Sequence, residues 1–353
     1  MSGGVDSSVA AALLREAGEE VIGLHMRVYR QPAGSSFKRS CCSPVDVADA
    51  QAVARRLDIP FYVLDMEQAF EREVINPFIE AYRQGRTPIP CVLCNERLKL
   101  GSLLEKARLF DAAGVATGHY ARVEQSDSGQ WRLRRPRFRA KDQTYYLFSL
   151  DQERLAALRM PVGELTKEEV RATARSLDLP VADKPDSAEI CFTAGASYQT
   201  FLEQRIDADD PALQPGPLVT TEGERIGTHG GVARYTVGQR RGLGVGAERP
   251  LYVTSLDAAS NTVVVGFEEQ TLAENLRASH ATWHEPPDAL AGRRLHAQIR
   301  ARHEAAPCRL TPTGSNAFEV TFESPQRSIA PGQAAVIFDE SNETVVAGGW
   351  IET

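Results

Sequence analysis

The 353-residue sequence lacks long apolar runs and has no excess of positive charge. No stretch approaches the roughly 18 consecutive apolar residues that a membrane-spanning helix needs, and we recognise no secretory signal. The formal net charge is −7, from 40 Lys and Arg against 47 Asp and Glu. A nucleic-acid partner would therefore have to be held by local basic patches and not by the field of the whole chain. We expect a cytoplasmic protein with no membrane partner.

Internal repeats and low-complexity tracts are also missing, and so is the common nucleotide-binding motif GxxxxGK[ST], since no Lys-Ser/Thr pair follows the amino-terminal glycines. The composition is 42% hydrophobic and 25% charged, which is ordinary for a globular protein. The length suggests two or three domains.

The six cysteines do not form a complete metal-binding or secretory pattern. Cys91 and Cys94 form one CxxC, which is half of a zinc site, and no second CxxC or HxH pair completes it. In a large chain without a secretion signal, cysteines are usually reduced thiols. From the spacing alone, Cys91 and Cys94 could be either a redox pair or two buried, unreactive thiols. A predicted helix start beside Cys94 would lower the pKa of its thiol and favour the reactive thiolate.

What is present begins at the amino end, with the segment MSGGVDSS followed by a predicted helix over residues 9–17. Two adjacent glycines let the backbone turn tightly and approach a bulky anion. A turn of this kind at a helix amino terminus presents free N–H groups, and the helix dipole favours negative charge there. The segment therefore predicts a phosphate or pyrophosphate site. The alternative is a flexible Ser/Gly terminus without a ligand.

The first half of the chain alternates apolar strands with amphipathic helices, which predicts a parallel sheet with right-handed crossovers. Ligands of such sheets bind beyond the carboxyl ends of the strands. We therefore expect Gly3-Gly4, Met26 and Gly118-His119 to converge on one crevice. The strands are expected at 21–28, 61–66 and 115–118, and further helices at 46–57, 70–84, 96–109, 145–150, 152–158, 166–177 and 198–204. A hairpin is expected around residues 127–129, and the sequence TKEE at 166–169 predicts a capping box at the start of the helix 166–177.

From about residue 207 the sequence changes to short alternating strands with Gly- and Pro-rich turns, a pattern typical of small β domains or a barrel. Among these strands we expect 251–256 to pair with 262–267. We expect three domains, 1–205, 206–270 and 271–353, with the last a β-barrel. Residues 132–141 carry basic and aromatic side chains that suit RNA or an ordinary solvated hairpin equally well. Arg294, Arg300 and Arg302 would share one face of a regular strand.

A set of motifs in order along the chain carries a specific resemblance. The first, SGGxDS, resembles the pyrophosphate loop of ATP pyrophosphatases, and together the motifs resemble the bacterial tRNA-specific 2-thiouridylase family. They are SGGVDSS at 2–8, GRTP at 85–88, Cys94-Asn95, ATGHY at 116–120, KDQ at 141–143, Asp186-Ser187, EICF at 189–192 and GQRRGLG at 238–244.

The resemblance implies an α/β fold with a doubly wound parallel sheet, like that of adenine nucleotide α-hydrolases, followed by two small β-rich domains. Relatives carry an apolar strand before the loop. That first strand is absent here, and we expect that the start codon was assigned too late. The family uses ATP and Mg²⁺ to adenylate the 2-carbonyl oxygen of the wobble uridine, and sulfur then displaces AMP. The residues matched to the nucleotide site are Met1, Ser2, Gly3, Gly4, Val5, Asp6, Ser7, Met26 and Gly118.

The resemblance also implies the residues of sulfur transfer. Cys191 would carry a persulfide received from a cysteine desulfurase or a sulfur-relay protein. Cys94 would act first as a nucleophile and then form a disulfide, and Asp6 would help to hold the metal. The positions matched to tRNA contacts are Ile89, Pro90, Cys91, His119, Lys141, Asp142, Gln143, Arg300, Ala301 and Gln333.

Three alternatives stay open at this point. Cys91, Cys94 and Cys191 could hold a [4Fe–4S] cluster with one iron open to a sulfur donor. The chain could instead be a small-molecule ligase with a pyrophosphate loop, which would need neither Cys94 nor Cys191. It could also be a tRNA-binding protein whose nucleotide site has decayed, which would bind tRNA without releasing pyrophosphate.

Overall fold

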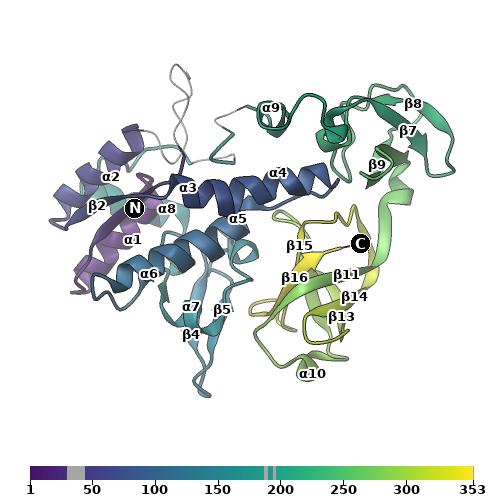
Figure 1. Cartoon of the computed structure of the whole chain (residues 1–353). Helices are drawn as coiled ribbons and strands as arrows, with labels where there is room; N and C mark the ends of the chain where they lie inside the picture. Colours follow the sequence, from purple (N-terminus) through teal and green to yellow (C-terminus); the bar gives the residue numbers. More distant parts are fainter. Residues whose placement is uncertain (30–43, 187–189, 194–195, 353) are drawn as a thin grey trace. The chain divides into compact units, whose positions relative to one another are not determined.

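The structure is a computed structural model that describes residues 1–29, 44–186, 190–193 and 196–352. Contacts divide the chain into two compact units, each described separately below (Figure 1). One comprises Met1–Val74 with Cys91–Ala196, and the other comprises Ile75–Pro90 with Ser197–Thr353. None of the helices in the described part of the chain is both long and apolar enough to span a membrane.

The first unit is α/β, as predicted, with short parallel strands and packed helices. β1 (Gly23–Arg27) pairs in parallel with β2 (Phe61–Asp65), and β3 (Val115–Ala116) pairs in parallel with β6 (Leu158–Arg159). In the described residues these strands form two separate pairs. Helices cover them because each has an apolar face to bury. They include α1 (Val5–Glu16), α2 (Pro44–Arg56) and α8 (Lys167–Ser176), and α1 packs against α8 through a core that contains Val5, Val9, Val170 and Ala174.

Two long helical stretches follow β2. The first runs through α3 (Glu67–Phe70), a π-helical segment (Glu71–Ile75) and α4 (Asn76–Arg83). The second runs through α5 (Pro90–Leu93), a π-helical segment (Cys94–Ser102) and α6 (Leu103–Arg108). The prediction that this second helix begins at residue 96 was wrong. It begins at Pro90, because proline suits the first helical turn, where its missing N–H has no acceptor to lose.

The rest of the first unit is made of short elements. β4 (Arg122–Gln125) and β5 (Trp131–Arg134) form the expected antiparallel hairpin. The predicted helix 152–158 is shorter, because α7 (Gln152–Ala156) ends before Leu158 joins β6. The predicted helix 145–150 is a single 3₁₀ turn, Thr144–Tyr146. Further 3₁₀ turns lie at Arg139–Lys141 and Pro161–Glu164.

The second unit begins its β-rich part after α9 (Tyr198–Glu203), where Tyr198 stacks on Tyr82 of α4 with ring centroids 4.6 Å apart. A four-stranded sheet follows in the order β8 (Arg225–His229), β7 (Gly216–Thr220), β10 (Thr262–Gly266), β9 (Tyr252–Asp257). The antiparallel pairing of β9 with β10 confirms that two-strand prediction. Three 3₁₀ turns connect these strands, at Pro211–Leu213, Val232–Arg234 and Glu268–Thr271.

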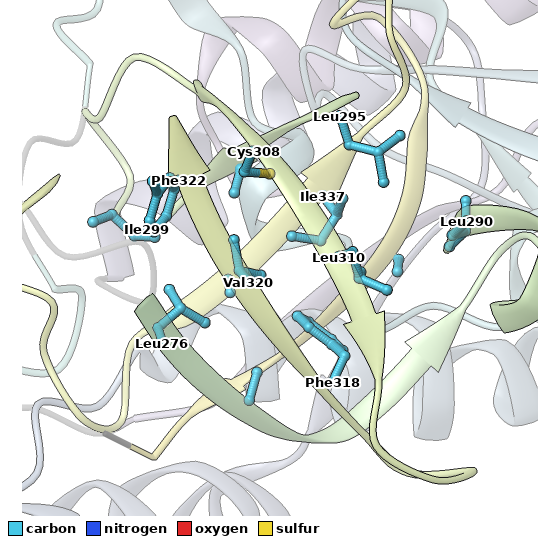
Figure 2. Packing of buried hydrophobic residues seen from close by; sticks show 14 of the residues in the cluster. Leu276, Leu290, Leu295, Ile299, Cys308, Leu310, Phe318, Val320, Phe322 and Ile337 are labelled. Carbon is cyan, nitrogen blue, oxygen red and sulfur yellow. The ribbon is translucent and has the colours of Figure 1, made fainter. Parts of the chain in front are cut away.

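The chain ends in a closed six-stranded barrel, which confirms the β-barrel prediction. Its order is β11 (Leu272–Trp283), β14 (Ala317–Arg327), β13 (Ala306–Pro312), β12 (Leu295–Gln298), β15 (Ala334–Phe338), β16 (Val345–Ile351), with α10 (Pro287–Leu290) beside it. Figure 2 shows apolar side chains from these strands, including Leu310, Phe318 and Ile337, packed inside the barrel. The prediction that Arg294, Arg300 and Arg302 share a strand face was wrong, because β12 covers only four residues between them.

Candidate functional site

The amino-terminal loop takes a conformation that only glycine can supply at position 3. Gly3 has φ +76°, and a Cβ atom there would overlap the carbonyl oxygen of Asp46. Gly4 is the N-cap of α1. The hydroxyls of Ser7 and Ser8 donate hydrogen bonds to the Gly4 carbonyl oxygen, at 3.2 and 2.9 Å. The sequence therefore builds a tight turn that delivers the chain directly into a helix.

The beginning of α1 presents unpaired backbone donors toward Gly118. The first N–H group that bonds back into the helix is that of Ser8, which donates to the Gly4 carbonyl oxygen at 3.3 Å. The preceding N–H groups have no intrahelical acceptor. A Cβ atom at Gly118, just past β3, would lie 2.5 Å from the Ser7 nitrogen and 2.6 Å from the carbonyl carbon of Asp6. Glycine at 118 thus lets the segment after β3 pack directly against the first turn of α1.

Asp6 lies in a charged network that extends through Lys167 to Asp186 of the Asp186-Ser187 motif. Lys167 Nζ donates to Asp6 Oδ1 and Oδ2 at 2.7 and 2.9 Å, and it also lies 2.7 Å from Asp186 Oδ1. The Tyr120 hydroxyl donates to Asp6 Oδ1 at 2.8 Å. Burial of Tyr120 and the nearby Asp6 carboxylate raise the pKa of this phenol, so it remains a hydrogen-bond donor.

A second lysine contacts the loop itself. Lys184 Nζ donates to the Gly3 carbonyl oxygen at 2.9 Å and to the carboxylates of Asp46 and Asp49 at 2.6 Å each. Burial acts to lower the pKa of Lys184, but the hydrogen bonds and charges of the two aspartates outweigh it and raise the pKa. The lysine is therefore a cation at neutral pH.

Sequence reasoning missed both lysines. Lys167 stands inside the predicted capping box, which the structure confirms between Thr166 and Glu169, but a capping motif says nothing about its other side chains. Lys184 lies two residues before the matched Asp186. That proximity was the only available signal, since a lysine in a loop is ordinarily solvated.

The predicted cysteines occupy two segments of the first unit. Cys91 is exposed and Cys94 half-buried, both within the first turns of the helical stretch that begins at Pro90. Cys191 is half-buried. Its neighbour Phe192 packs edge-to-face on Phe70 of α3, with ring centroids 5.7 Å apart. Since α3 contacts the segment Cys94–Ser102, a chain of contacts connects the two cysteine-bearing segments.

In the described residues no three His, Cys, Asp or Glu side chains are grouped as they would be around a metal ion. Cys91, Cys94 and Cys191 therefore do not form the three-thiolate set that the [4Fe–4S] hypothesis requires. The [4Fe–4S] hypothesis thus gains no support from their arrangement.

The KDQ motif contacts the loop that follows β3. The Gln143 side-chain oxygen accepts from the Tyr120 N–H at 2.9 Å, and the Gln143 N–H donates to the Tyr120 carbonyl at 3.0 Å. Lys141 Nζ donates to Asp186 Oδ2 at 3.0 Å, and Asp142 pairs with Arg135. Burial and the positive charge of Lys99 lower the pKa of His119, which is therefore neutral at pH 7.

The remaining predicted site residues belong to β1 and to the second unit. Met26 lies in β1, opposite Leu64 of β2. In the second unit Ile89 and Pro90 are buried, and Gln333 Nε2 donates to the Thr87 carbonyl at 3.0 Å. Gln333 therefore lies beside the segment that leads to Ile89. Arg300 and Ala301 are half-buried after β12, and Arg300 donates to the Arg327 carbonyl at 2.8 Å.

Three family models match the chain in succession. They are described as tRNA methyl transferase HUP domain (residues 1–195), tRNA methyl transferase PRC-barrel domain (199–267) and Aminomethyltransferase beta-barrel domain (273–351).

Curated relatives are similar over the whole length. A tRNA-specific 2-thiouridylase MnmA from Koribacter versatilis is 46% identical over 361 residues, covering 99% of this chain and 97% of the relative. The protein of the same name from Acidobacterium capsulatum is 45% identical over 365 residues, with the same two coverages. One from Symbiobacterium thermophilum is 46% identical, covering 100% of this chain and 90% of the relative.

Proposed function

The chain belongs to the tRNA-specific 2-thiouridylase family, and we propose that it converts the 2-carbonyl of the wobble uridine in tRNA to a thiocarbonyl at the expense of ATP. The uridine oxygen attacks the α-phosphorus of ATP, and pyrophosphate leaves. The resulting phosphate ester is a far better leaving group than a carbonyl oxygen. Sulfur then attacks C2, the C–O bond breaks, and AMP leaves.

The observation that carries this proposal is the open amino terminus of α1 between Gly3 and Gly118. Neither position has space for a Cβ atom, so only glycine lets the turn at Gly3 and the strand end at Gly118 pack against α1, and we infer that the phosphates of ATP bind at the free N–H groups of its first turn. The Ser2 hydroxyl, 3.2 Å from the Ser7 hydroxyl, adds a donor on the same turn. Fixed donors of this kind stabilise the charge that develops on a phosphate during transfer.

Asp6 suits a magnesium site of the kind that this chemistry uses. Mg²⁺ is usually held by one or two carboxylates together with phosphate oxygens of the substrate, and Asp6 follows the glycine turn directly. When bound, the ion would offset negative charge on the phosphates of ATP. Lys167 and Tyr120 already donate to Asp6, so they hold its carboxylate in one orientation.

For sulfur transfer we propose that Cys191 carries the persulfide and Cys94 its partner thiol. The Cys94 thiolate attacks the inner sulfur of the persulfide, a Cys94–Cys191 disulfide forms, and hydrosulfide is released for attack on C2. Two equivalents of an external thiol then reduce the disulfide and are themselves oxidised to a disulfide, and a sulfur donor, either a cysteine desulfurase or a relay protein, renews the persulfide. Cys94 follows the first helical turn, which starts at Pro90, and its side chain is half-buried.

The tRNA would be bound by local basic and polar groups, in the cytoplasm where tRNA is modified. Arg240 and Arg241 are exposed in the glycine-rich segment 238–244, and neither side chain has an ion-pair or hydrogen-bond partner among the described residues. Guanidinium groups bind phosphate through two parallel hydrogen bonds.

The matched positions Ile89, Pro90, Cys91, His119, Lys141, Asp142, Gln143, Arg300, Ala301 and Gln333 complete the proposed tRNA contacts. We propose catalytic, central and barrel domains at 1–205, 206–270 and 271–353.

The test is pyrophosphate release from ATP with and without unmodified tRNA, combined with detection of 2-thiouridine. We expect release to depend on tRNA and thiouridine to appear when a persulfide donor is supplied. Release with a small molecule in place of tRNA would favour a ligase, and tRNA binding without release would favour a decayed nucleotide site. Iron-dependent thiolation after anaerobic purification would replace the persulfide route with the [4Fe–4S] route.

A further inference from the structure

Lys184 contacts the nucleotide loop at the Gly3 carbonyl oxygen. We propose that Lys184 is a positioning residue that sets the orientation of the Gly3–Gly4 peptide and thereby points the Gly4 N–H group at the phosphates of ATP. This inference rests on the proposed function, because it assigns a role within the same nucleotide site. Its basis is the 2.9 Å hydrogen bond from Lys184 Nζ to the Gly3 carbonyl oxygen.

Because the peptide group between Gly3 and Gly4 is planar, the contact of Lys184 with the Gly3 carbonyl oxygen also fixes the direction of the Gly4 N–H group. The peptide bond is planar and trans, so the carbonyl oxygen of one residue and the N–H of the next point in opposite directions. Lys184 holds the Gly3 oxygen, and the Gly4 N–H must therefore point away from Lys184. Gly4 is the N-cap of α1, so this N–H stands at the head of the free donors of the first turn.

The loop needs such a restraint because its glycines do not provide one. Glycine has access to both signs of φ, and a Gly-Gly peptide can flip at little steric cost. A flipped peptide would present the Gly3 carbonyl oxygen to the phosphates and would repel them.

The two aspartates hold the ammonium in place for this task. Asp46 and Asp49 each accept from Lys184 at 2.6 Å, and both lie on α2, one turn apart. Together the three acceptors use all three N–H bonds of the ammonium. Asp46 also fixes the loop from its backbone, since its carbonyl oxygen fills the space beside Gly3.

Lys184 also connects the nucleotide loop to the segment that leads to Cys191. Two residues later, Asp186 is paired with Lys167 and Lys141, and Lys167 pairs in turn with Asp6. The segment 184–186 is therefore bound to the loop at Gly3 and, through Lys167, at Asp6. Both attachments would be present when the nucleotide site is correctly formed.

The experiment measures the Kd of the full-length protein for α,β-methylene ATP, an analogue that cannot release pyrophosphate, so the result does not depend on catalysis. For Lys184→Met we expect Kd to rise about ten- to hundredfold, as for loss of a hydrogen bond to a charged group. Lys184→Arg, which keeps the charge and donors, should recover part of the affinity. If Lys184→Met does not fold, Lys184→Arg alone must still show a raised Kd with an unchanged melting temperature.

Asp49→Asn is the matched control, because it removes one negative charge beside Lys184 but keeps a side-chain oxygen that can accept from it, while Asp46 and the Gly3 carbonyl still accept from the ammonium. We expect its Kd to stay within about threefold of wild type. An unchanged Kd in Lys184→Met, or an equal rise in Asp49→Asn, would overturn the proposal. If wild-type protein binds the analogue but never releases pyrophosphate with tRNA, the proposed function fails while the role of Lys184 in nucleotide binding stands.

Discussion

Gly118 lies so close to Ser7 that a Cβ atom at position 118 would be 2.5 Å from the Ser7 backbone nitrogen. The two residues are 111 positions apart in the sequence, and they meet because β3 ends at the amino terminus of α1. Any side chain at 118 would have to displace the first turn of the helix or occupy the space in front of its N–H groups. The absence of a side chain therefore lets this strand end and the helix start approach each other closely.

Gly118→Ala is expected to raise the KM for ATP at least about tenfold, since misplacement of reacting groups by about 1 Å costs up to about a hundredfold in rate. The measurement is tRNA-dependent pyrophosphate release at varied ATP concentration. Gly246→Ala is the control, because a Cβ atom there meets no heavy atom within 4 Å and the position does not have positive φ. Equal KM values for the two variants would contradict an ATP site in front of Ser7.

Cys94→Ser and Cys191→Ser are each expected to abolish 2-thiouridine formation and to leave pyrophosphate release in place, because adenylation precedes sulfur transfer. The products are measured by nucleoside mass spectrometry and by release of labelled pyrophosphate. Cys308→Ala is the control. Its thiol is buried in the barrel, where burial raises the pKa to about 12 and keeps it protonated. Thiolation by either serine variant would refute the assigned roles.

Arg240→Ala combined with Arg241→Ala is expected to weaken tRNA binding and to reduce its dependence on salt. Each lost phosphate contact lowers the slope of log K against log salt by about 0.7 to 0.9. The control is Arg249→Ala with Arg294→Ala, which changes net charge equally but removes arginines already paired with Glu269 and Glu323. The affinity of both double variants for tRNA is measured by titration at several salt concentrations. Identical slopes for the two double variants would remove residues 240 and 241 from the tRNA surface.

Leu310→Ala is expected to destabilise the barrel by about 2 to 5 kcal/mol, the usual cost of a cavity left by a buried leucine. Leu310 is 1% exposed inside the barrel, and Leu272, at the start of β11, is 47% exposed. Leu272→Ala deletes the same atoms at the surface, and we expect a change within about 0.5 kcal/mol. Urea denaturation of the full chain, followed by Trp fluorescence, compares them. A similar loss in both would mean that the barrel interior is not closely packed.

Much of the fold could be predicted because its signals are local. The hairpin of β4 and β5, the pair β9 and β10, and the capping box at Thr166 all depend on residues a few positions apart. Where two local signals compete, the prediction was less accurate. The helix expected from residue 96 begins at Pro90, and Leu158 belongs to a strand and not to the preceding helix. Leu158 is in a strand because it pairs with β3, and no pattern of neighbouring residues in the sequence predicts that pairing.

The sequence by itself determined the glycine turn, the helix that follows it and the motifs that identify the family, because turn and helix preferences depend on each residue and its near neighbours. Only the tertiary structure placed Lys184 on the Gly3 carbonyl, 181 positions away, and Lys167 on Asp6, 161 positions away. A lysine side chain is equally suited to solvent and to a buried carboxylate, so its role depends on which acceptors the fold brings within reach.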